Sequence, residues 1–390
     1  MTTSTVEPWR QSSIGRYICR LLLEAGITVN GDAPWDIQVH NRAVFRRVLL
    51  AGTIGLGESY VDGWWDCDDL RGFFERLIRW RNGRRRAPLV EWQRVLLNLT
   101  RCVHNRQNLR RARRVADAHY DLPACLFEAM LGSTMAYSCG YWPGVATLGD
   151  AQRNKMDLIC RKLRIRPSDR VLDLGCGFGS FARFAAERYG CSVVGVTNST
   201  SHARFARDLC QGLPVEIHEC DYRAVHDYTN GARFDKVVSI AMCEAIGAAN
   251  YRTYMEIVDE VLVENGLWLL HTLGDRACSS DPWMNKHIFP NGELPTHPQL
   301  DKAMRGLFTV EDFHCFQSDY CQTVEAWEAN FIGQWQTLRS RNEALFNDRF
   351  FRMWTYYLRS CWGSLRAENM QLWQIVMSKP GFAGGYDAVR

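Results

Sequence analysis

The spacing of apolar residues divides the chain into two regions. Residues 13 to about 80 repeat apolar positions every three and four residues, as in IGRYICRLLLEAG, and this spacing predicts helices. The alternating stretch WDIQVHN interrupts them and predicts a strand or two. The basic stretch RNGRRRAP, which contains Gly and Pro, is typical of a connection. The first region is therefore predicted to be mainly helical.

From about residue 150 the pattern changes to short runs rich in Val, Ile and Leu that alternate with helical segments. The predicted strands are RVLDLG, CSVVGVT, PVEIHEC, FDKVVSIAM and GLWLLHTLG. Segments such as SFARFAAERY and YRTYMEIVDEVL separate them with helical spacing. This alternation predicts an α/β fold, with a parallel sheet covered by helices on both faces. We expect two domains, residues 1–112 and residues 113–390.

Composition agrees with two units and narrows the setting. The chain has 390 residues, 46% of them hydrophobic, and single cores stop growing well below that length. Its fifteen cysteines include no CxxC pair, and no signal-like segment begins the chain, so we expect reduced thiols and a cytoplasmic protein. No apolar run approaches the roughly 20 residues of a membrane-spanning helix. The protein is predicted to be soluble, or to lie on a membrane without crossing it.

Positive charge is concentrated in two clusters, although the formal net charge is only +4 and excludes no class of partner. The clusters are RWRNGRRR (79–86) and RQNLRRARR (106–114). Such clusters are usually solvated faces of helices or linkers. The alternative is that they bind phosphates, of nucleic acid or of anionic lipid headgroups.

A glycine loop follows the first predicted strand of the α/β region, where VLDL runs into GCGFGS and a helix. Such a loop lets the backbone approach a polar or anionic ligand, whereas the alternative is a tight turn without one. A dinucleotide site has G-x-G-x-x-G and an acid about 20 residues later. Here the third glycine comes one position early, and the second strand ends at Thr197 and Asn198. The loop resembles that of S-adenosylmethionine-dependent methyltransferases.

Polar residues follow the remaining predicted strands, at the edge where parallel sheets bind ligands. Asp221 and Tyr222 follow the third strand, where they are candidates to hold an adenine. Glu244 follows the fourth strand, and the fifth ends at His271. Glu244 has an ordinary alternative as a helix cap, and His271 as a hydrogen-bonded structural residue. Their coincidence beside a nucleoside loop favours a functional site.

Long ordered stretches resemble the cyclopropane-fatty-acyl-phospholipid synthase family, almost from end to end. They are GESYVDGWWDCDDL, AHYDL, MAYSCGYW, VLDLGCGFGSFARFAAERYG, GVTNST, FDKVVSIAMCEAIG, LLHTLG, DPWMNKHIFPNGELP and MWTYYLRSCWGSLRAENMQLWQIV. The resemblance implies a Rossmann-like methyltransferase with a mainly helical N-terminal domain. It also implies transfer of the methyl group of S-adenosylmethionine to a cis double bond of a phospholipid acyl chain, followed by loss of a proton and closure of a cyclopropane ring.

The resemblance also implies the site residues. A bicarbonate ion would be the base, held by Cys139, Glu244, His271 and Tyr320. Cys361 matches a cysteine once assigned as the nucleophile, but the chemistry needs no thiol, so we expect it to line the pocket. The implied S-adenosylmethionine site comprises Tyr137, Ser138, Asp173, Gly175, Cys176, Gly177, Gly179, Thr197, Asn198, Ser199, Thr200, Ser201, His202, Asp221 and Tyr222. No metal site is expected.

The stretch YSCGYW (137–142) brings several of these roles together. Tyr137 and Ser138 would contact the cofactor, and Cys139 would help to hold the base. Aromatic faces stabilise cations, which gives Tyr141 and Trp142 a role beside a carbocation. Ordinary core packing is an equally open interpretation for each of these two rings.

Three departures from the family pattern leave the product open. Cys243-Glu244-Ala245 stands where Phe-Glu-His is usual, Pro123-Ala124 replaces Gly-Asn, and GVTNSTSHA differs around the second strand. The alternatives are a related lipid methyltransferase with a methylated, non-ring product, a small-molecule N-methyltransferase, and a silent lipid-binding relative. Retention of the four implied bicarbonate ligands argues against silence.

The N-terminal domain is expected to dock the enzyme peripherally on the inner membrane. Its basic clusters would attract anionic lipid, and Tyr60, Trp64 and Trp65 are candidate membrane contacts, with burial in the core as the alternative. The expected partner is therefore a phospholipid with an unsaturated acyl chain, not nucleic acid. The resemblance also points to a homodimer.

Overall fold

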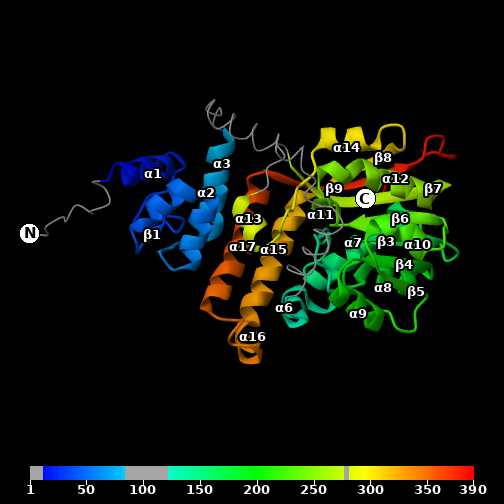
Figure 1. The fold of residues 1–390 in the computed structure, drawn as a ribbon, viewed down its shortest axis with the longest axis horizontal. Coiled ribbons are helices and arrows are strands. Elements are labelled where there is room, and N and C mark those ends of the chain that lie inside the picture. The colour runs from blue at the N-terminus through cyan, green and yellow to red at the C-terminus, as the bar shows by residue number, and fades with distance from the viewer. Residues whose placement is uncertain (1–11, 84–121, 276–280) are drawn as a thin grey trace, which may run out of the picture.

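The computed structural model describes residues 12–83, 122–275 and 281–390, shown as coloured ribbon in Figure 1. The predicted domain boundary after residue 112 and the basic cluster 106–114 lie outside these residues, as do the last three residues of the cluster 79–86. The N-terminal elements are α1 (Ser13–Glu24), β1 (Gln38–Val39), α2 (Ala43–Val61), β2 (Trp65–Asp66) and α3 (Leu70–Gly83). The predicted helices and the short strand in WDIQVHN are confirmed.

Local sequence explains where these helices begin and bend. Ser12 caps α1, because its side-chain oxygen accepts a hydrogen bond from the Gly15 amide at 2.9 Å. The helix α2 is kinked at Gly52, whose φ of +56° suits a residue without a Cβ. Leu49 and Leu50, just before the kink, are left on the surface.

A seven-stranded sheet forms the other end of the molecule (Figure 1). Its order is β5-β4-β3-β6-β7-β9-β8; β9 is antiparallel to both of its neighbours, and β3 to β7 are mutually parallel. The strands are β3 (Arg170–Leu174), β4 (Ser192–Thr197), β5 (Val215–Glu219), β6 (Phe234–Ile240), β7 (Leu262–Asp275), β8 (Thr309–Cys315) and β9 (Met370–Ser378). All five predicted strands are present, and β8 and β9 are additional to them.

Helices cover both faces of the sheet, as predicted. The helices near the sheet are α7 (Leu148–Lys162), α8 (Ser180–Tyr189), α9 (Thr200–Leu209), α10 (Val225–Tyr228), α12 (Tyr251–Val261) and α14 (His297–Met304). Alternate strand residues pack on opposite sides. Val171 and Leu269 join a cluster with residues of α7 and α8, whereas Leu172 and Leu270 join one with residues of α12.

A layer of helices lies between the N-terminal elements and the sheet (Figure 1). It contains α6 (Ala124–Leu131), α11 (Cys243–Ile246), α13 (Pro282–His287), α15 (Gln317–Gly333), α16 (Trp335–Arg341) and α17 (Asp348–Arg366). One hydrophobic cluster runs from α1, α2 and α3 into α6, α15 and α17. Glu328 of α15 joins the layers, because it accepts hydrogen bonds from Arg71 of α3 and Arg359 of α17.

The expected exposure of the N-terminal aromatic residues is wrong for two of the three. Trp65 is fully buried and Tyr60 is buried, because both pack in the cluster shared with α17. Trp64 is half-buried, with the guanidinium of Arg47 4.8 Å from its ring centre. A membrane contact of this domain must therefore use other residues.

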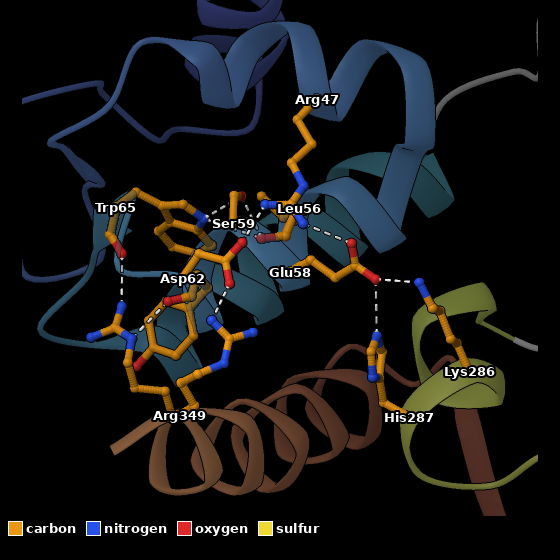
Figure 2. Close-up of polar contacts among 11 residues, drawn as sticks. Arg47, Leu56, Glu58, Ser59, Asp62, Trp65, Lys286, His287 and Arg349 are labelled. Atoms are coloured by element: carbon orange, nitrogen blue, oxygen red, sulfur yellow. Dashed lines mark hydrogen bonds and ion pairs between the residues drawn. The ribbon is translucent and has the colours of Figure 1, made fainter. Parts of the chain in front are cut away.

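An ion network fastens α2 to α13 and α17 (Figure 2). Glu58 accepts hydrogen bonds from Arg47, Lys286 and His287, and these contacts, the one with Lys286 foremost, lower its pKa to about 2. Asp62 accepts from Arg47 and from Arg349 of α17. The network ties the N-terminal elements to the segment that follows β7.

The predictions on membrane spans and cysteines can be compared with the described residues. None of the helices in the described ranges is both long and apolar enough to cross a membrane. The thirteen cysteines in these ranges are free thiols.

Candidate active site

The glycine loop between β3 and α8 has the open backbone that its sequence predicts. Gly175, Gly177 and Gly179 have φ values of +79°, +51° and +81°, which favour glycine. A Cβ at Gly175 would lie 2.8 Å from the side chain of Met242, whereas one at Gly177 would meet no atom within 4 Å. The loop therefore leaves backbone accessible at Gly177. Cys176 turns its side chain away, into a cluster with Ala203 and Ala206.

Asp173, near the end of β3 and just before this loop, lies in a buried polar cluster. Its Oδ2 has no hydrogen-bond partner within the described ranges, and burial raises its pKa to about 7. The fully buried Lys155 of α7 lies within electrostatic range of Asp173 and donates a hydrogen bond to Ser138 Oγ at 2.7 Å. Burial lowers the pKa of Lys155 to about 8. Lys155 therefore places a positive charge beside Ser138 and Asp173, two of the predicted cofactor residues.

The turn after β4 is built by short polar side chains. Ser199 caps α9 through a hydrogen bond from the His202 amide, and the His202 ring packs on Phe178 with centroids 4.1 Å apart. Thr197 and Ser199 are buried, whereas Thr200 turns to Glu219 at 2.7 Å. Asn198, Ser199 and the first turn of α9 therefore lie beside the glycine loop, and Thr200 is bonded to Glu219 at the end of β5.

Asp221 and Tyr222 follow β5, where Asp221 is bonded to Arg223 and Tyr222 lies in the core. The Asp221 carboxylate accepts hydrogen bonds from the Arg223 amide and guanidinium. Tyr222 is buried edge-on to Tyr254, with centroids 5.6 Å apart, and its hydroxyl has no hydrogen-bond partner in the described part of the chain. Its ring is therefore packed as a core residue, with only the polar tip unsatisfied.

Glu244 is bonded to the strand that carries His271, although the two residues lie on different elements. His271 pairs with Ile240 at the end of β6, and β7 continues to Asp275, four residues farther than the predicted strand end. Glu244, on the short helix α11, accepts a hydrogen bond from the Leu273 amide of β7 at 2.7 Å. That contact holds the carboxyl beside the strand that carries the imidazole.

Both side chains present a polar atom that the described residues leave unsatisfied: Glu244 Oε2 and His271 Nε2. Burial raises the pKa of Glu244 to about 7. Burial, with added effects of Lys155 and Lys162, lowers the pKa of His271 well below its usual value. At neutral pH the imidazole is therefore neutral, and the carboxyl is close to its midpoint.

The turn YSCGYW is fastened to α7 and α15. A Cβ at Gly140 would lie 2.9 Å from Ala151 Cβ, so this position needs glycine. Thr323 Oγ1 accepts hydrogen bonds from the Gly140 amide at 3.0 Å and from Trp142 Nε1 at 2.9 Å. Cys139 is fully buried between these anchors, and burial raises the pKa of its thiol well above the usual value.

Tyr320 completes the cluster from α15. Its hydroxyl lies within electrostatic range of Cys139, Glu244, Cys361 and Tyr137, and it packs with Cys139, Phe316 and Leu372. The Tyr137 hydroxyl is 2.7 Å from that of Tyr357. The structure thus brings together the predicted residues Tyr137, Cys139, Glu244, Tyr320 and Cys361, and the His271 ring lies 6.1 Å from the ring of Phe316 in the same cluster.

Some neighbours of these groups were not predicted. Lys155, Gln152 and Gln374 are buried and contact Ser138 or His271, but no strand-end or loop rule selects them. The one sequence signal is Gln374 inside the apolar run of β9, because α7 carries many other polar residues beside Gln152 and Lys155. No cluster of three or more metal-binding side chains occurs among the described residues.

The sheet order, the glycine loop and the polar groups at the strand ends define the class of S-adenosylmethionine-dependent methyltransferases. The structure titled mycolic acid cyclopropane synthase CmaA1 complexed with SAH and CTAB matches with a TM-score of 0.60 and 26% identity, over 68% of this chain and 98% of that one. Coclaurine N-methyltransferase matches with a TM-score of 0.67 over 84% of this chain and all of that one, but its 20% identity supports the fold alone.

The chain belongs to the mycolic acid cyclopropane synthetase family, which matches residues 107–375. The cyclopropane-fatty-acyl-phospholipid synthase of Escherichia coli strain K12 is 43% identical over 361 residues, or 92% of each chain. A probable fatty acid methyltransferase of Pseudomonas putida is 33% identical over 69% of this chain and 70% of its own. The expected family, fold and enzyme class are confirmed.

Proposed function

We propose that the protein transfers a methylene group from S-adenosylmethionine to a cis double bond of a phospholipid acyl chain and forms a cyclopropane fatty acid. The observation that carries this proposal is the pair of unsatisfied buried atoms, Glu244 Oε2 and His271 Nε2, beside the apolar cluster of Cys139, Phe316 and Tyr320. The 43% identity to the Escherichia coli enzyme supports the substrate class.

This surrounding suits an alkene, which is a poor nucleophile. Its π electrons form a carbon–carbon bond to the methyl group, the carbon–sulfur bond breaks, and S-adenosylhomocysteine leaves. The resulting cation loses a proton from the transferred methyl group, and the released C–H electron pair closes the ring. Aromatic residues such as Tyr141, Phe316 and Tyr320 exclude water from the cation and present ring faces to it.

The residues we propose for S-adenosylmethionine surround the glycine loop. The accessible backbone at Gly177 and the unsatisfied Asp173 Oδ2 fit a ligand with a charged amino acid end and a nucleoside. Tyr137 and Ser138 come from the turn, and Thr197 to His202 and Asp221 to Tyr222 from the ends of β4 and β5. Asp221 is paired with Arg223, and Tyr222 lies in the core. We therefore propose that these two residues bind the cofactor only through their backbone and the Tyr222 hydroxyl.

Cys139, Glu244, His271 and Tyr320 are the residues we propose to hold bicarbonate. A small anion with several oxygens fits two unsatisfied polar atoms that lie beside one strand. Protonated Glu244 and neutral His271 can both donate hydrogen bonds, and the pKa of about 7 makes the protonated carboxyl available at neutral pH. Bound bicarbonate supplies the base for the proton lost on ring closure. The four side chains orient it and keep water out.

The test is incubation of the protein with S-adenosylmethionine carrying a labelled methyl group and vesicles of unsaturated phospholipid. Label should enter the acyl chains, and NMR of the purified lipid should show cyclopropyl protons at high field. A methylene-branched product has the same mass as the ring, so the NMR spectrum decides between them. Absence of label from lipid, with label in a soluble amine, would overturn the proposal.

A second product class is favoured by one sequence difference and one relative. Ala245 replaces the usual histidine directly after Glu244, and the tuberculostearic acid methyltransferase UfaA1 of Mycobacterium tuberculosis is 28% identical over 87% of this chain. In this alternative the protein methylates a lipid without closing the ring. The same NMR spectrum would then lack cyclopropyl protons and show an alkene or branched methyl signal.

We also propose that the protein acts as a cytoplasmic enzyme bound peripherally to the anionic inner membrane. The end of the molecule formed by α1 and α2 carries exposed Tyr17, Leu23, Leu49 and Leu50, which are 48% to 73% exposed. Exposed arginines accompany them at positions 16, 20, 42 and 46. Apolar side chains beside basic ones suit an anionic lipid surface, to which each basic residue adds about 1 kcal/mol.

A homodimer is the remaining part of the proposal. The edge strand β8 exposes Val310 and Phe313, and an exposed apolar edge is a suitable contact for a second copy. Light scattering after size exclusion should give twice the 44.9 kDa mass of the chain. A monomeric mass would contradict the dimer.

A further inference from the structure

His271 and Gln374 lie directly opposite each other in the sheet. They are paired across β7 and β9, with 1% and 0% of their surface exposed. Leu269 and Val376, two residues from each of them, belong to the cluster beneath α7. Because alternate residues share a face, both polar side chains lie on the α7 side of the sheet.

A hydrogen bond between these side chains determines where the imidazole carries its proton. Gln374 Nε2 lies 3.2 Å from His271 Nδ1, and an amide nitrogen only donates, so Nδ1 is the acceptor. A neutral imidazole has a single N–H group, which must then be at Nε2. Nε2 is the atom that no described residue satisfies.

We propose that Gln374 is a positioning residue that fixes His271 in its Nε2–H tautomer, so that the ring offers a donor to the anion held with Glu244. The inference rests on the proposed bicarbonate site. With the other tautomer, a lone pair at Nε2 would face the anion and repel it. A buried glutamine thereby acts on the base through a neighbouring ring without touching it.

The neighbours of the pair are consistent with this role. His314 pairs with Gln374 from the β8 side, but its own Nδ1 lies 3.2 Å from Lys162 Nζ. Lys162 also forms an ion pair with Asp312 at 3.0 Å. Burial, with the added effect of the nearby lysine charges, disfavours protonation of His271, which leaves Gln374 to select between the two neutral forms.

The first test needs no activity. The protein is labelled with nitrogen-15 histidine, kept free of bicarbonate, and examined by long-range nitrogen–proton correlation NMR. The protein has ten histidines, and the signal of His271 is assigned as the one that disappears in His271→Gln. We expect a neutral His271 ring with the proton on Nε2. A proton on Nδ1 in the wild-type protein would overturn the inference.

The second test changes the partner. In Gln374→Glu the carboxylate accepts a hydrogen bond and draws the proton to Nδ1, so the half-saturating bicarbonate concentration should rise at least about tenfold. S-adenosylmethionine affinity should stay within about twofold, since Gln374 does not contact that site. Gln371→Glu is the matched control, because it adds the same charge on β9 at a residue that contacts Trp373 and pairs with Gly274.

The outcomes separate this inference from the proposal on which it rests. A proton shift to Nδ1 in Gln374→Glu without a change in bicarbonate requirement would overturn the role of the tautomer. Equal effects of Gln371→Glu and Gln374→Glu would do the same. Wild-type turnover that ignores bicarbonate would contradict the bicarbonate site itself, while the NMR result would still report the state of the ring.

Discussion

Glu244 shows how one side chain depends on its burial. Its Oε1 accepts one backbone hydrogen bond, its Oε2 has no partner among the described residues, and burial raises its pKa to about 7. A raised carboxyl pKa means that the buried charged form is disfavoured. Below that pKa the neutral carboxyl donates a hydrogen bond, and above it a carboxylate repels an anion.

This behaviour predicts a pH dependence of bicarbonate binding. The half-saturating bicarbonate concentration, corrected for the fraction present as bicarbonate, should rise as pH increases from 6 to 8.5 through the pKa of about 7. Glu244→Gln keeps a neutral donor and should flatten the profile. Glu244→Ala removes the donor and should lower turnover at least about 100-fold, while S-adenosylmethionine still binds. A half-saturating bicarbonate concentration of the wild type that falls as pH increases would contradict the role of protonated Glu244 as a hydrogen-bond donor.

Cys361 is predicted to be dispensable as a nucleophile. Burial raises its pKa to about 12, so its thiolate is rare at neutral pH, and the proposed reaction uses none. Cys361→Ala should therefore keep turnover within about threefold, apart from a small packing effect. A loss of turnover of about 1,000-fold, with an unchanged melting temperature, would contradict this prediction and support Cys361 as a nucleophile.

The polar residues at strand ends could be predicted from the sequence, whereas the buried side chains that contact them from other elements could not. Glu244 and His271 follow from the rule that ligands bind beyond the carboxyl ends of parallel strands. Lys155 and Gln374 approach the same site from α7 and from a strand 103 residues after His271 in sequence. Only the pairing of β7 with β9 brings Gln374 there, and no local pattern encodes that pairing.

Secondary-structure elements illustrate the same difference. The five parallel strands have hydrophobic runs with clear helices between them, so periodicity predicts them. Strand β8 (TVEDFHC) lies at the edge of the sheet and buries only Asp312, so it has no hydrophobic run. Strand β9 directly follows the long helix α17, which also has many apolar residues. The burial of Trp65 was not predictable either, because it depends on packing against α17.

The ion network between α2 and α13 should stabilise the fold. Glu58→Gln removes the charge that accepts from the cations Arg47 and Lys286 and from the ring of His287, and the free energy of unfolding should fall by about 2 kcal/mol. Glu343→Gln is the control, since its side chain is 76% exposed and pairs only with Arg339, and it should change stability by less than about 0.5 kcal/mol. Urea denaturation of both variants measures the difference, and equal stabilities would contradict the role of the network.

The depressed pKa of Glu58 gives this contribution a direction with pH. The folded pKa of about 2 lies below the ordinary value of 4.5, so the stabilisation is complete above 4.5 and is lost as pH falls toward 2. The difference between wild type and Glu58→Gln should therefore narrow from pH 5 to pH 2.5.

The whole molecule is arranged as an apolar, arginine-bearing end joined through a helical layer to the catalytic sheet (Figure 1). Docking by that end would bring lipid to the protein without a membrane-spanning helix. The proposed docking surface lies in the N-terminal elements, where the sequence led us to expect it. It consists of other residues than expected, because Tyr60 and Trp65 are buried and Leu49 and Leu50 are exposed.

Vesicle flotation tests this arrangement. Leu49→Glu with Leu50→Glu should reduce binding to anionic vesicles at least about tenfold, because it replaces two exposed apolar groups with two like charges. Tyr228→Glu, at the opposite end of the molecule on α10, is the control, because Tyr228 is also an exposed hydrophobic residue, and it should bind as wild type does. Equal binding of wild type to neutral and anionic vesicles would refute the electrostatic contribution.

The central claim is that the transferred methyl group loses one of its own hydrogens and becomes the ring carbon. S-adenosylmethionine with a trideuterated methyl group tests it most directly, with unsaturated phospholipid vesicles as acceptor and mass spectrometry of the released fatty acids. The account predicts that each modified chain gains one carbon and two deuterium atoms, together with cyclopropyl signals in the NMR spectrum. Retention of all three deuterium atoms in the lipid, or no deuterium in it, would contradict the account.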